Sequence, residues 1–261
     1  MSQGQPAVPE PPPPPLETPV IEPSSPGPAF LASLAGLYTA PGEAFARILA
    51  RPRWVWPLVA GLVVAMAFMA IWLQKVDPLQ IAQMNVDEGP FADRMSAEER
   101  ADAIRTGARY LKPQYLIGML VGNPLFVFFL GGLFLFVYRF FYGAEVRYAQ
   151  SLAVVSWALL VVSLVTNPLT LAVLGLKGEW NVDPRYAFQG NLSLFLDQES
   201  ASKPLYALAQ EIDLFSFWTL FLLACGFGVA ARKTTAAAFW GVLVPWAVYV
   251  VGKVGLVALM S

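Results

Sequence analysis

Long runs of apolar residues dominate the chain from residue 54 to its end. A helix needs about 20 residues to cross the hydrocarbon core of a bilayer, and five runs reach that length. They span residues 54–73, 116–137, 148–176, 213–231 and 236–259. The pattern predicts an all-α polytopic membrane protein, a bundle of five transmembrane helices accompanied by interfacial amphipathic helices.

The third run, 148–176, is longer than one membrane crossing requires, and Pro168 lies inside it. Proline removes a backbone donor and disfavours a continuing helix. We therefore expect this span to tilt, to kink, or to finish near Pro168 with a short apolar extension. Because the number of spans is odd, the two termini are expected on opposite sides of the membrane.

The first 28 residues have a different composition from the rest of the chain. They hold 11 of the 22 prolines and only isolated apolar residues, so they lack the means to bury a core. We expect residues 1–28 to form a disordered, proline-rich cytosolic tail. The run 11–15 leaves two readings open, a solvated tail or a polyproline II ligand for an aromatic groove.

Composition narrows the function. The chain is 57% hydrophobic and 13% charged, which is typical of a membrane protein, and its net charge of −1 gives no sign of a nucleic-acid partner. Histidine is absent and cysteine occurs once, which disfavours metal-assisted chemistry and excludes an intramolecular disulfide. No catalytic, cofactor or metal motif is present, so we expect no enzyme activity and no cofactor.

Basic residues near the span ends set the expected orientation. They are concentrated on the N-terminal side of the bundle, at Arg47, Arg51, Arg53, Arg139, Arg147, Arg232 and Lys233. The long loops on the other side carry more basic residues in total, but these are diluted among acids. The density predicts a cytosolic N-terminus and an exterior C-terminus.

A short amphipathic segment precedes the first span. Pro41 suits the first turn of a helix, and Phe45, Ile48 and Leu49 then fall on one face. We expect that apolar face to lie in the membrane interface, where the helix would anchor the topology. Tyr38 lies just before this helix and is a candidate for contact with a partner.

The residues between this helix and the first span complete a cationic collar. Arg51 and Arg53 are expected to meet anionic lipid headgroups, and Trp54 and Trp56 are expected to mark the membrane boundary. The lipid bilayer is therefore the first partner that the sequence predicts.

The first long loop is expected to contain an amphipathic helix. Ser96 and Glu99 have the spacing of a capping box, and Pro113 is expected to end the segment. One face of this helix combines Ala101, Ile104, Ala108 and Leu111. The pattern predicts an interfacial or packed helix between the first two spans.

The second long loop mixes aromatic residues with turn signals. Its aromatic residues are expected to form a cap at the headgroup level, and they are Trp180, Tyr186, Phe188 and Phe195. Leu205, Leu208 and Ile212 then predict a helix that leads into the fourth span.

Polar residues inside the spans are candidates for function because each is costly in hydrocarbon unless it has a partner. The candidates are Asn123, Ser156, Ser163 and Asn167. One reading is a polar path through spans two and three, as in a transporter. The other is that each asparagine satisfies backbone carbonyls beside the following proline and neighbouring helices.

Pairs of small residues predict close contacts between helices. Gly118 with Gly122, Gly61 with Ala65, and Gly226 with Gly228 have the spacing of such contacts.

Three stretches together resemble the Yip (Ypt-interacting protein) family, in its bacterial form. They are "LYTAPGEAFARILARPRWVWPL", "YGAEVRYAQSLAVVSWALLVVSLVTNPL" and "DLFSFWTLFLLACGFGVAARKTTAAAFWGVLVPWAVYVVGKVGLVAL". The resemblance implies a five-span bundle with a cytosolic N-terminus, a short exterior C-terminus and no known catalytic activity. Because the resemblance is to bacterial members, it also implies a place in the inner (plasma) membrane of a bacterium. It implies that residues 29–261 form one Yip-like membrane domain.

Eukaryotic relatives bind Rab-type GTPases through an Asp-Leu-Tyr-Gly-Pro element and a Tyr-Gly-Tyr element. This chain keeps Leu37, Tyr38 and, one residue late, Pro41, but Gly36 occupies the aspartate position. At the second element Tyr148 remains and is followed by Ala149 and Gln150. These departures argue against GTPase binding.

Three functions are compatible with these patterns. The first is a non-enzymatic scaffold or adaptor that binds another membrane or cytosolic protein or organises the bilayer. The second is a small-solute transporter or channel with a polar path through spans two and three. The third is an intramembrane enzyme that uses carboxylates of the exterior loops, and nothing in the motifs favours it.

Overall fold

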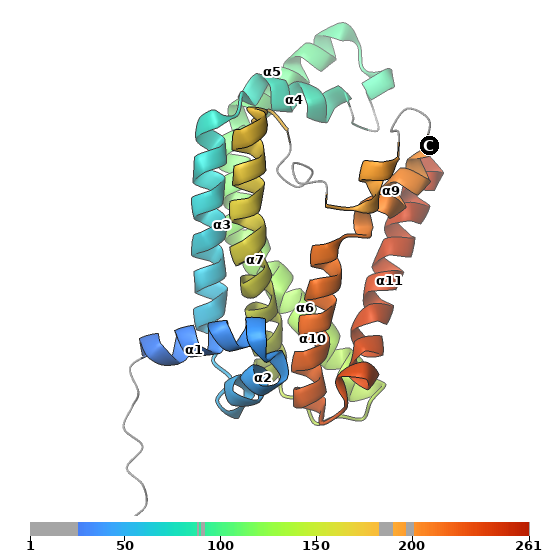
Figure 1. Cartoon of the computed structure of the whole chain (residues 1–261). Coiled ribbons are helices and arrows are strands. Elements are labelled where there is room, and N and C mark those ends of the chain that lie inside the picture. The colour runs from blue at the N-terminus through green and yellow to red at the C-terminus, as the bar shows by residue number, and fades with distance from the viewer. Residues whose placement is uncertain (1–25, 88, 90–91, 183–189, 197–200, 261) are drawn as a thin grey trace, which may run out of the picture.

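The computed structural model describes residues 26–87, 89, 92–182, 190–196 and 201–260 (Figure 1). The described chain is helical and contains no strand, with a single isolated bridge between Asn191 and Asp213. This confirms the all-α prediction. Most of the expected tail lies outside the described residues, as do Tyr186 and Phe188 of the expected aromatic cap. The first helix, α1, begins at Pro26 within the stretch assigned to the tail.

In the part of the chain that the structure describes, five helices are long and apolar enough to cross a membrane, as the hydropathy pattern predicts. They are α3 (Val55–Lys75), the continuous series α5 (Ala97–Ile117), η2 (Gly118–Gly122) and α6 (Asn123–Phe140), α7 (Tyr148–Lys177), α10 (Leu214–Ala231) and α11 (Thr235–Met260). The shorter elements are α1 (Pro26–Thr39), α2 (Pro41–Ala50), α4 (Pro78–Asp87), η1 (Ala92–Arg94), η3 (Leu192–Phe195) and α9 (Lys203–Glu211).

The expectation that Pro113 ends its segment is wrong, and of the three outcomes expected for the third span, an end near Pro168 is excluded. Helix α7 runs unbroken through Pro168, and α5 continues through Pro113 into the π-helix η2 and then α6. Inside a bundle, neighbouring helices and local adjustments compensate the backbone groups that a proline frees. The capping box at the start of α5 is confirmed, since Ser96 Oγ accepts from the Glu99 amide at 3.2 Å and Glu99 accepts from the Ser96 amide at 2.8 Å.

The bundle has two different ends (Figure 1). Helices α1 and α2 lie at one end with the α6–α7 connection and the α10–α11 turn, and we call this the α2 end. Helices α4, α5 and α9 and the C-terminus lie at the other, which we call the α9 end. The N-terminal helix and the C-terminus are therefore at opposite ends of the bundle.

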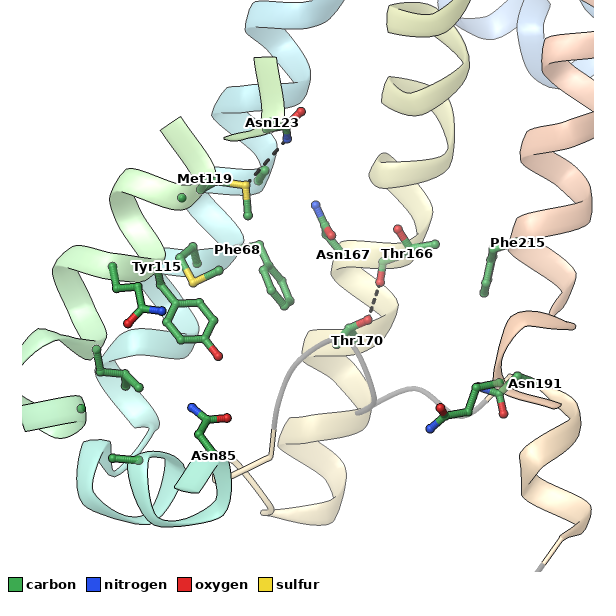
Figure 2. A pocket seen from close by; sticks show the side chains of 18 of the residues that line it. Phe68, Asn85, Tyr115, Met119, Asn123, Thr166, Asn167, Thr170, Asn191 and Phe215 are labelled. Atoms are coloured by element: carbon green, nitrogen blue, oxygen red, sulfur yellow. Dashed lines mark hydrogen bonds between the residues drawn. The ribbon is translucent and has the colours of Figure 1, made fainter. Parts of the chain in front are cut away.

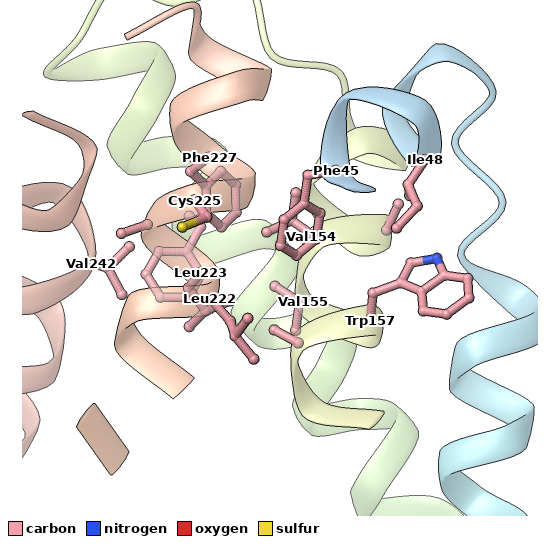
Figure 3. Close-up of a cluster of buried hydrophobic side chains, with 14 of the residues drawn as sticks. Phe45, Ile48, Val154, Val155, Trp157, Leu222, Leu223, Cys225, Phe227 and Val242 are labelled. Atoms are coloured by element: carbon pink, nitrogen blue, oxygen red, sulfur yellow. The ribbon is translucent and has the colours of Figure 1, made fainter. Parts of the chain in front are cut away.

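The main hydrophobic core fills the α2 end, and the collar helix α2 is part of it. Phe45 is fully buried, and Ile48 and Leu49 are 6% and 5% exposed. Figure 3 shows Phe45 directed between Val154 of α7 and Phe227 of α10. The expectation that this apolar face rests in the membrane interface is therefore wrong, because protein and not lipid covers it.

A smaller cluster holds the α9 end together on the side of α3. It joins α3, α4, α5 and α7 through Trp72, Ile81, Leu111 and Leu174. The Trp72 indole donates a hydrogen bond to the Trp180 carbonyl at 3.1 Å, which ties the end of α3 to the segment after α7. Helix α10 takes no part in this cluster.

Candidate functional site

A cleft of about 1080 Å³ lies toward the α9 end, between the α3, α5, α6 and α7 side of the bundle and the start of α10 (Figure 2). Residues from α4 and the stretch around η3 also line it. Its volume lies at the upper limit of ordinary small-molecule pockets. Its lining mixes aromatic and aliphatic residues with amides and hydroxyls.

The cleft brings together the two asparagines that the sequence singles out. Asn123 at the start of α6 and Asn167 in α7 both line it (Figure 2). The Asn123 amide donates to the Met119 sulfur at 3.7 Å, and a thioether is a weak acceptor. The Asn167 amide points into the cleft and makes no hydrogen bond with any described residue.

Three other polar groups of the cleft are already used within their own segments. Thr166 donates to the Val162 carbonyl at 3.2 Å, and Thr170 donates to the Thr166 carbonyl at 2.9 Å. Asp213 caps α10 by accepting from the amides of Phe215 and Ser216 at 2.8 and 3.0 Å. Among the described residues, the side-chain amides of the cleft with unused donors and acceptors are Asn167, within the span, and Asn85, Gln114 and Gln210 toward the α9 end.

The two hydroxyls of the expected polar path do not reach the cleft. Ser156 is 2% exposed, and its hydroxyl is buried without a hydrogen-bond partner among the described residues. Ser163 donates to the Leu160 carbonyl one turn earlier at 2.9 Å. These serines therefore do not line the cleft with the two asparagines.

The hairpin of α1 and α2 packs against α7 and α10 at the α2 end. The Tyr38 hydroxyl donates to the Val161 carbonyl at 2.8 Å, and its ring lies 5.8 Å from the Trp218 ring. Val161 is six residues before Asn167, so this contact lies about 9 Å from the cleft asparagine along α7. Partial burial raises the pKa of the Tyr38 hydroxyl, which therefore stays a donor.

Tyr38 and Tyr148, the tyrosines of the two elements compared with the family, each donate a hydrogen bond that joins two helices of the bundle. Tyr38 joins α1 to α7, and the Tyr148 hydroxyl donates to the Phe128 carbonyl at 3.1 Å, joining α7 to α6. Gly36, at the position of the family's aspartate, packs so closely on α2 that a Cβ there would lie 2.8 Å from Nη2 of Arg47. Pro41 is the first residue of α2, as its position predicts.

The charged and aromatic residues of the collar remain accessible. Arg51, Arg53 and Trp56 are exposed, as expected for a boundary with lipid. Trp54 is half-buried, and its ring lies 5.6 Å from that of Phe128 in α6.

The glycine pairs fall into two kinds. A Cβ on Gly226 would lie 2.5 Å from Val154 Cγ1, and one on Gly228 would lie 3.2 Å from the Lys233 carbonyl, so the close-packing prediction holds for this pair. Gly61 makes an ordinary contact at 4.0 Å with Leu160. For Gly118 and Gly122 the prediction is wrong, because nothing lies within 4 Å of a Cβ at either position.

The chemistry available at the cleft is recognition by hydrogen bonds and apolar contact. Among the described residues no group of three His, Cys, Asp or Glu side chains could hold a metal ion. The single cysteine, Cys225, is buried in the core of the α2 end, away from the cleft.

Reasoning from sequence missed the cleft residues that come from the segments between the spans, such as Asn85 of α4 and Asn191. Asn191 is held by the bridge to Asp213, which carries the segment after α7 to the start of α10. The sequence "DLFS" at 213–216 does carry a signal, since aspartate before an apolar run is a typical N-cap. The remaining loop residues lie near no motif.

The family model of the Yip1 domain matches residues 35–256, a stretch that runs from the end of α1 into α11 and contains the whole cleft. Comparison with curated proteins and with solved structures gives no match.

Proposed function

This chain belongs to the Yip1 family and is a multi-pass membrane protein, and from that premise we propose that it acts as a non-enzymatic scaffold or adaptor. Its cleft would receive a helical segment of another membrane protein. A partner helix with an Asn, Gln, Ser or Thr side chain facing Asn167 has the matching chemistry.

The observation that carries this proposal is the Asn167 amide, which faces the cleft without a hydrogen bond to any described residue. A polar side chain within a membrane span is costly unless it has a partner. Polar side chains also join helices by hydrogen bonds across their interface. An incoming polar side chain would satisfy the Asn167 amide and fix the register of the partner.

The size of the cleft suits a piece of helix. A helix about 11 Å across occupies about 95 Å² in cross-section. A cleft of about 1080 Å³ therefore corresponds to about two helical turns. Gly118 and Gly122 leave open space along the η2 side, where a partner backbone could approach closely.

Charge supports placing the α2 end in the cytosol. The segments 29–57, 139–147 and 232–234 together carry seven basic and two acidic residues, the excess expected of cytosolic loops. On this proposal the cleft belongs to the exterior half of the plasma membrane.

A transporter is the second candidate, because Asn123 and Asn167 line one cleft. We prefer the adaptor for two reasons. Tyr38 and the core of the α2 end fill the bundle on the α2 side of the cleft. Ser156 and Ser163 do not extend the polar lining of the cleft along α7. Purified protein in liposomes should move no solute. Flux that is lost in Asn167→Leu would overturn the adaptor in favour of the transporter.

Site-specific photo-crosslinking tests the adaptor directly. A photoreactive residue at position 123, which lines the cleft and leaves Asn167 intact, should trap one defined membrane protein in the cells that make this chain. Position 121 is the matched control, because Val121 lies on the same continuous helix and is exposed but does not line the cleft. Introducing Gly118→Leu should remove the adduct at 123 by filling the cleft. The same adducts at both positions, or an adduct at 123 that survives Gly118→Leu, would contradict the proposal.

A further inference from the structure

A second pocket, of about 590 Å³, lies at the α2 end between α1, α2, α3 and α7. We call it the arginine groove. Three arginines line it, Arg47, Arg51 and Arg53. The rest of its wall is mostly apolar and comprises Ala29, Phe30, Leu31, Ile48, Trp56, Val59, Ala60 and Trp157, with Ser33 as the remaining residue.

The positive charge of the arginine groove is poorly compensated. Arg51 and Arg53 form no ion pair or hydrogen bond with any described residue. Arg47 approaches Glu43 only at 4.0 Å, in an exposed pair whose side chains are 57% and 80% accessible, and such a pair is weak. Glu43 does not line the groove. The site therefore presents up to three guanidinium groups for an anion.

The apolar wall decides which anion fits. Trp56 and Val59 at the start of α3 are 57% and 44% exposed, and the Trp157 ring lies tilted against that of Phe30 with centroids 4.8 Å apart. A free phosphate would pair with the arginines but would leave this wall uncovered. A lipid covers both parts, since its headgroup is anionic and its acyl chain is apolar.

We infer that the arginine groove binds one anionic glycerophospholipid. The headgroup phosphate lies between Arg51 and Arg53 with Arg47 beside it, where planar guanidinium groups can each donate two hydrogen bonds to phosphate oxygens. The acyl chain runs along α3 over Val59 toward Trp157. The lipid would thus bridge the α1–α2 hairpin and the first span, independently of what the cleft on the α9 end receives.

Native mass spectrometry of the detergent-purified full chain tests this inference, with phosphatidylglycerol and phosphatidylcholine as probes. The wild type should retain one phosphatidylglycerol in preference to phosphatidylcholine. The double variant Arg51→Gln with Arg53→Gln should weaken that binding about thirtyfold. The matched control is Arg147→Gln with Lys233→Gln, which removes two exposed charges at the same end but outside the groove and should retain the lipid.

Two further arms separate a lipid site from simple charge attraction. Val59→Trp keeps all three arginines but narrows the groove where the acyl chain would lie, so it should also weaken phosphatidylglycerol binding. Inorganic phosphate should displace the lipid only at concentrations at least a hundredfold higher. Equal loss in the control pair, no effect of Val59→Trp, or equal competition by phosphate would each overturn the inference, provided that the melting temperature of the variant is unchanged.

Discussion

Glycines and polar side chains have different surroundings at the two ends of the bundle. At the α2 end a Cβ on Gly226 would overlap Val154, whereas at the α9 end a Cβ on Gly118 would meet nothing within 4 Å. Tyr138 is buried and donates its hydroxyl to the Ala238 carbonyl, whereas Asn167 has no partner among the described residues. The core of the α2 end is filled by packed side chains, whereas the cleft of the α9 end contains polar groups without a hydrogen-bond partner among the described residues.

This contrast indicates that the core of the α2 end stabilises the fold and that the cleft of the α9 end is available for binding. The α2 end interlocks α2, α6, α7, α10 and α11, with Phe227 stacked on Tyr138 at 4.6 Å and tilted against Phe134 at 5.1 Å. The interior of this core leaves no room for a ligand and fixes the fold, and the arginine groove lies at its margin. The α9 end can accept a partner without disturbing that core. Substitutions at the two ends should therefore have different consequences.

The largest effect is expected for Phe45→Ala. Removing a fully buried phenyl ring from between α7 and α10 should lower the free energy of unfolding by about 3 kcal/mol through loss of packing and the cavity left behind. Thermal unfolding in detergent, followed by circular dichroism, measures it. Trp56→Ala is the control, since Trp56 is 57% exposed and should cost little. Equal losses in the two variants would mean that α2 is not part of the core.

Gly226→Ala should be the next most damaging change. The new methyl group would lie 2.5 Å from Val154 Cγ1 and 3.2 Å from the Phe45 ring, and overpacking of this kind costs about 1–3 kcal/mol. Gly118→Ala adds the same methyl in open space and should keep or slightly raise the melting temperature. If Gly226→Ala were as stable as Gly118→Ala, the close contact of α10 with α7 would be wrong.

Tyr138→Phe should have a smaller effect. It removes the hydroxyl that donates to the Ala238 carbonyl at 2.6 Å, so a buried hydrogen bond between α6 and α11 is lost at a cost of about 1 kcal/mol. The matched control is Tyr249→Phe, because Tyr249 lies on α11 with 57% exposure. A midpoint of unfolding that is identical for the two variants would show that the α6–α11 hydrogen bond contributes nothing.

The smallest effect on stability is expected for Asn167→Leu. No hydrogen bond to a described residue is lost, so the free energy of unfolding should change by less than about 0.5 kcal/mol. Partner crosslinking from position 123 should nevertheless fall, because the incoming helix would lose its polar contact. A strongly destabilised Asn167→Leu protein would show that this amide holds the bundle together.

The spans and the family could be predicted because they depend on local patterns. Length and hydropathy identify five crossing helices, and the stretch around Pro41 carries the family resemblance. The placement of α2 could not be read in the same way. An amphipathic helix has the same pattern whether lipid or protein covers its apolar face, so the burial of Phe45 depends on contacts with Val154 and Gly226 that lie far along the chain.

The cleft was predictable only in part. Asn123 and Asn167 stand out as polar residues within apolar runs, and both line it. Ser156 has the same signal but lies in the core, because its position on α7 turns it toward the packed side. Which face of a long helix meets a neighbour is decided by the whole bundle, and all-apolar spans carry no periodicity that would reveal it.

Thiol labelling within the cleft tests the central claim, that the α9 end is an open site which a partner occupies. In a Cys225→Ser background, Met119→Cys, which places the thiol in the cleft and keeps Asn167, should react rapidly with a small membrane-impermeant thiol reagent in the purified protein. In the membranes of the cells that make this chain, the same position should react at least tenfold more slowly, while Ser156→Cys should stay unreactive in both. Equal rates at position 119 in the two preparations, or reaction at position 156 as fast as at 119, would contradict the account.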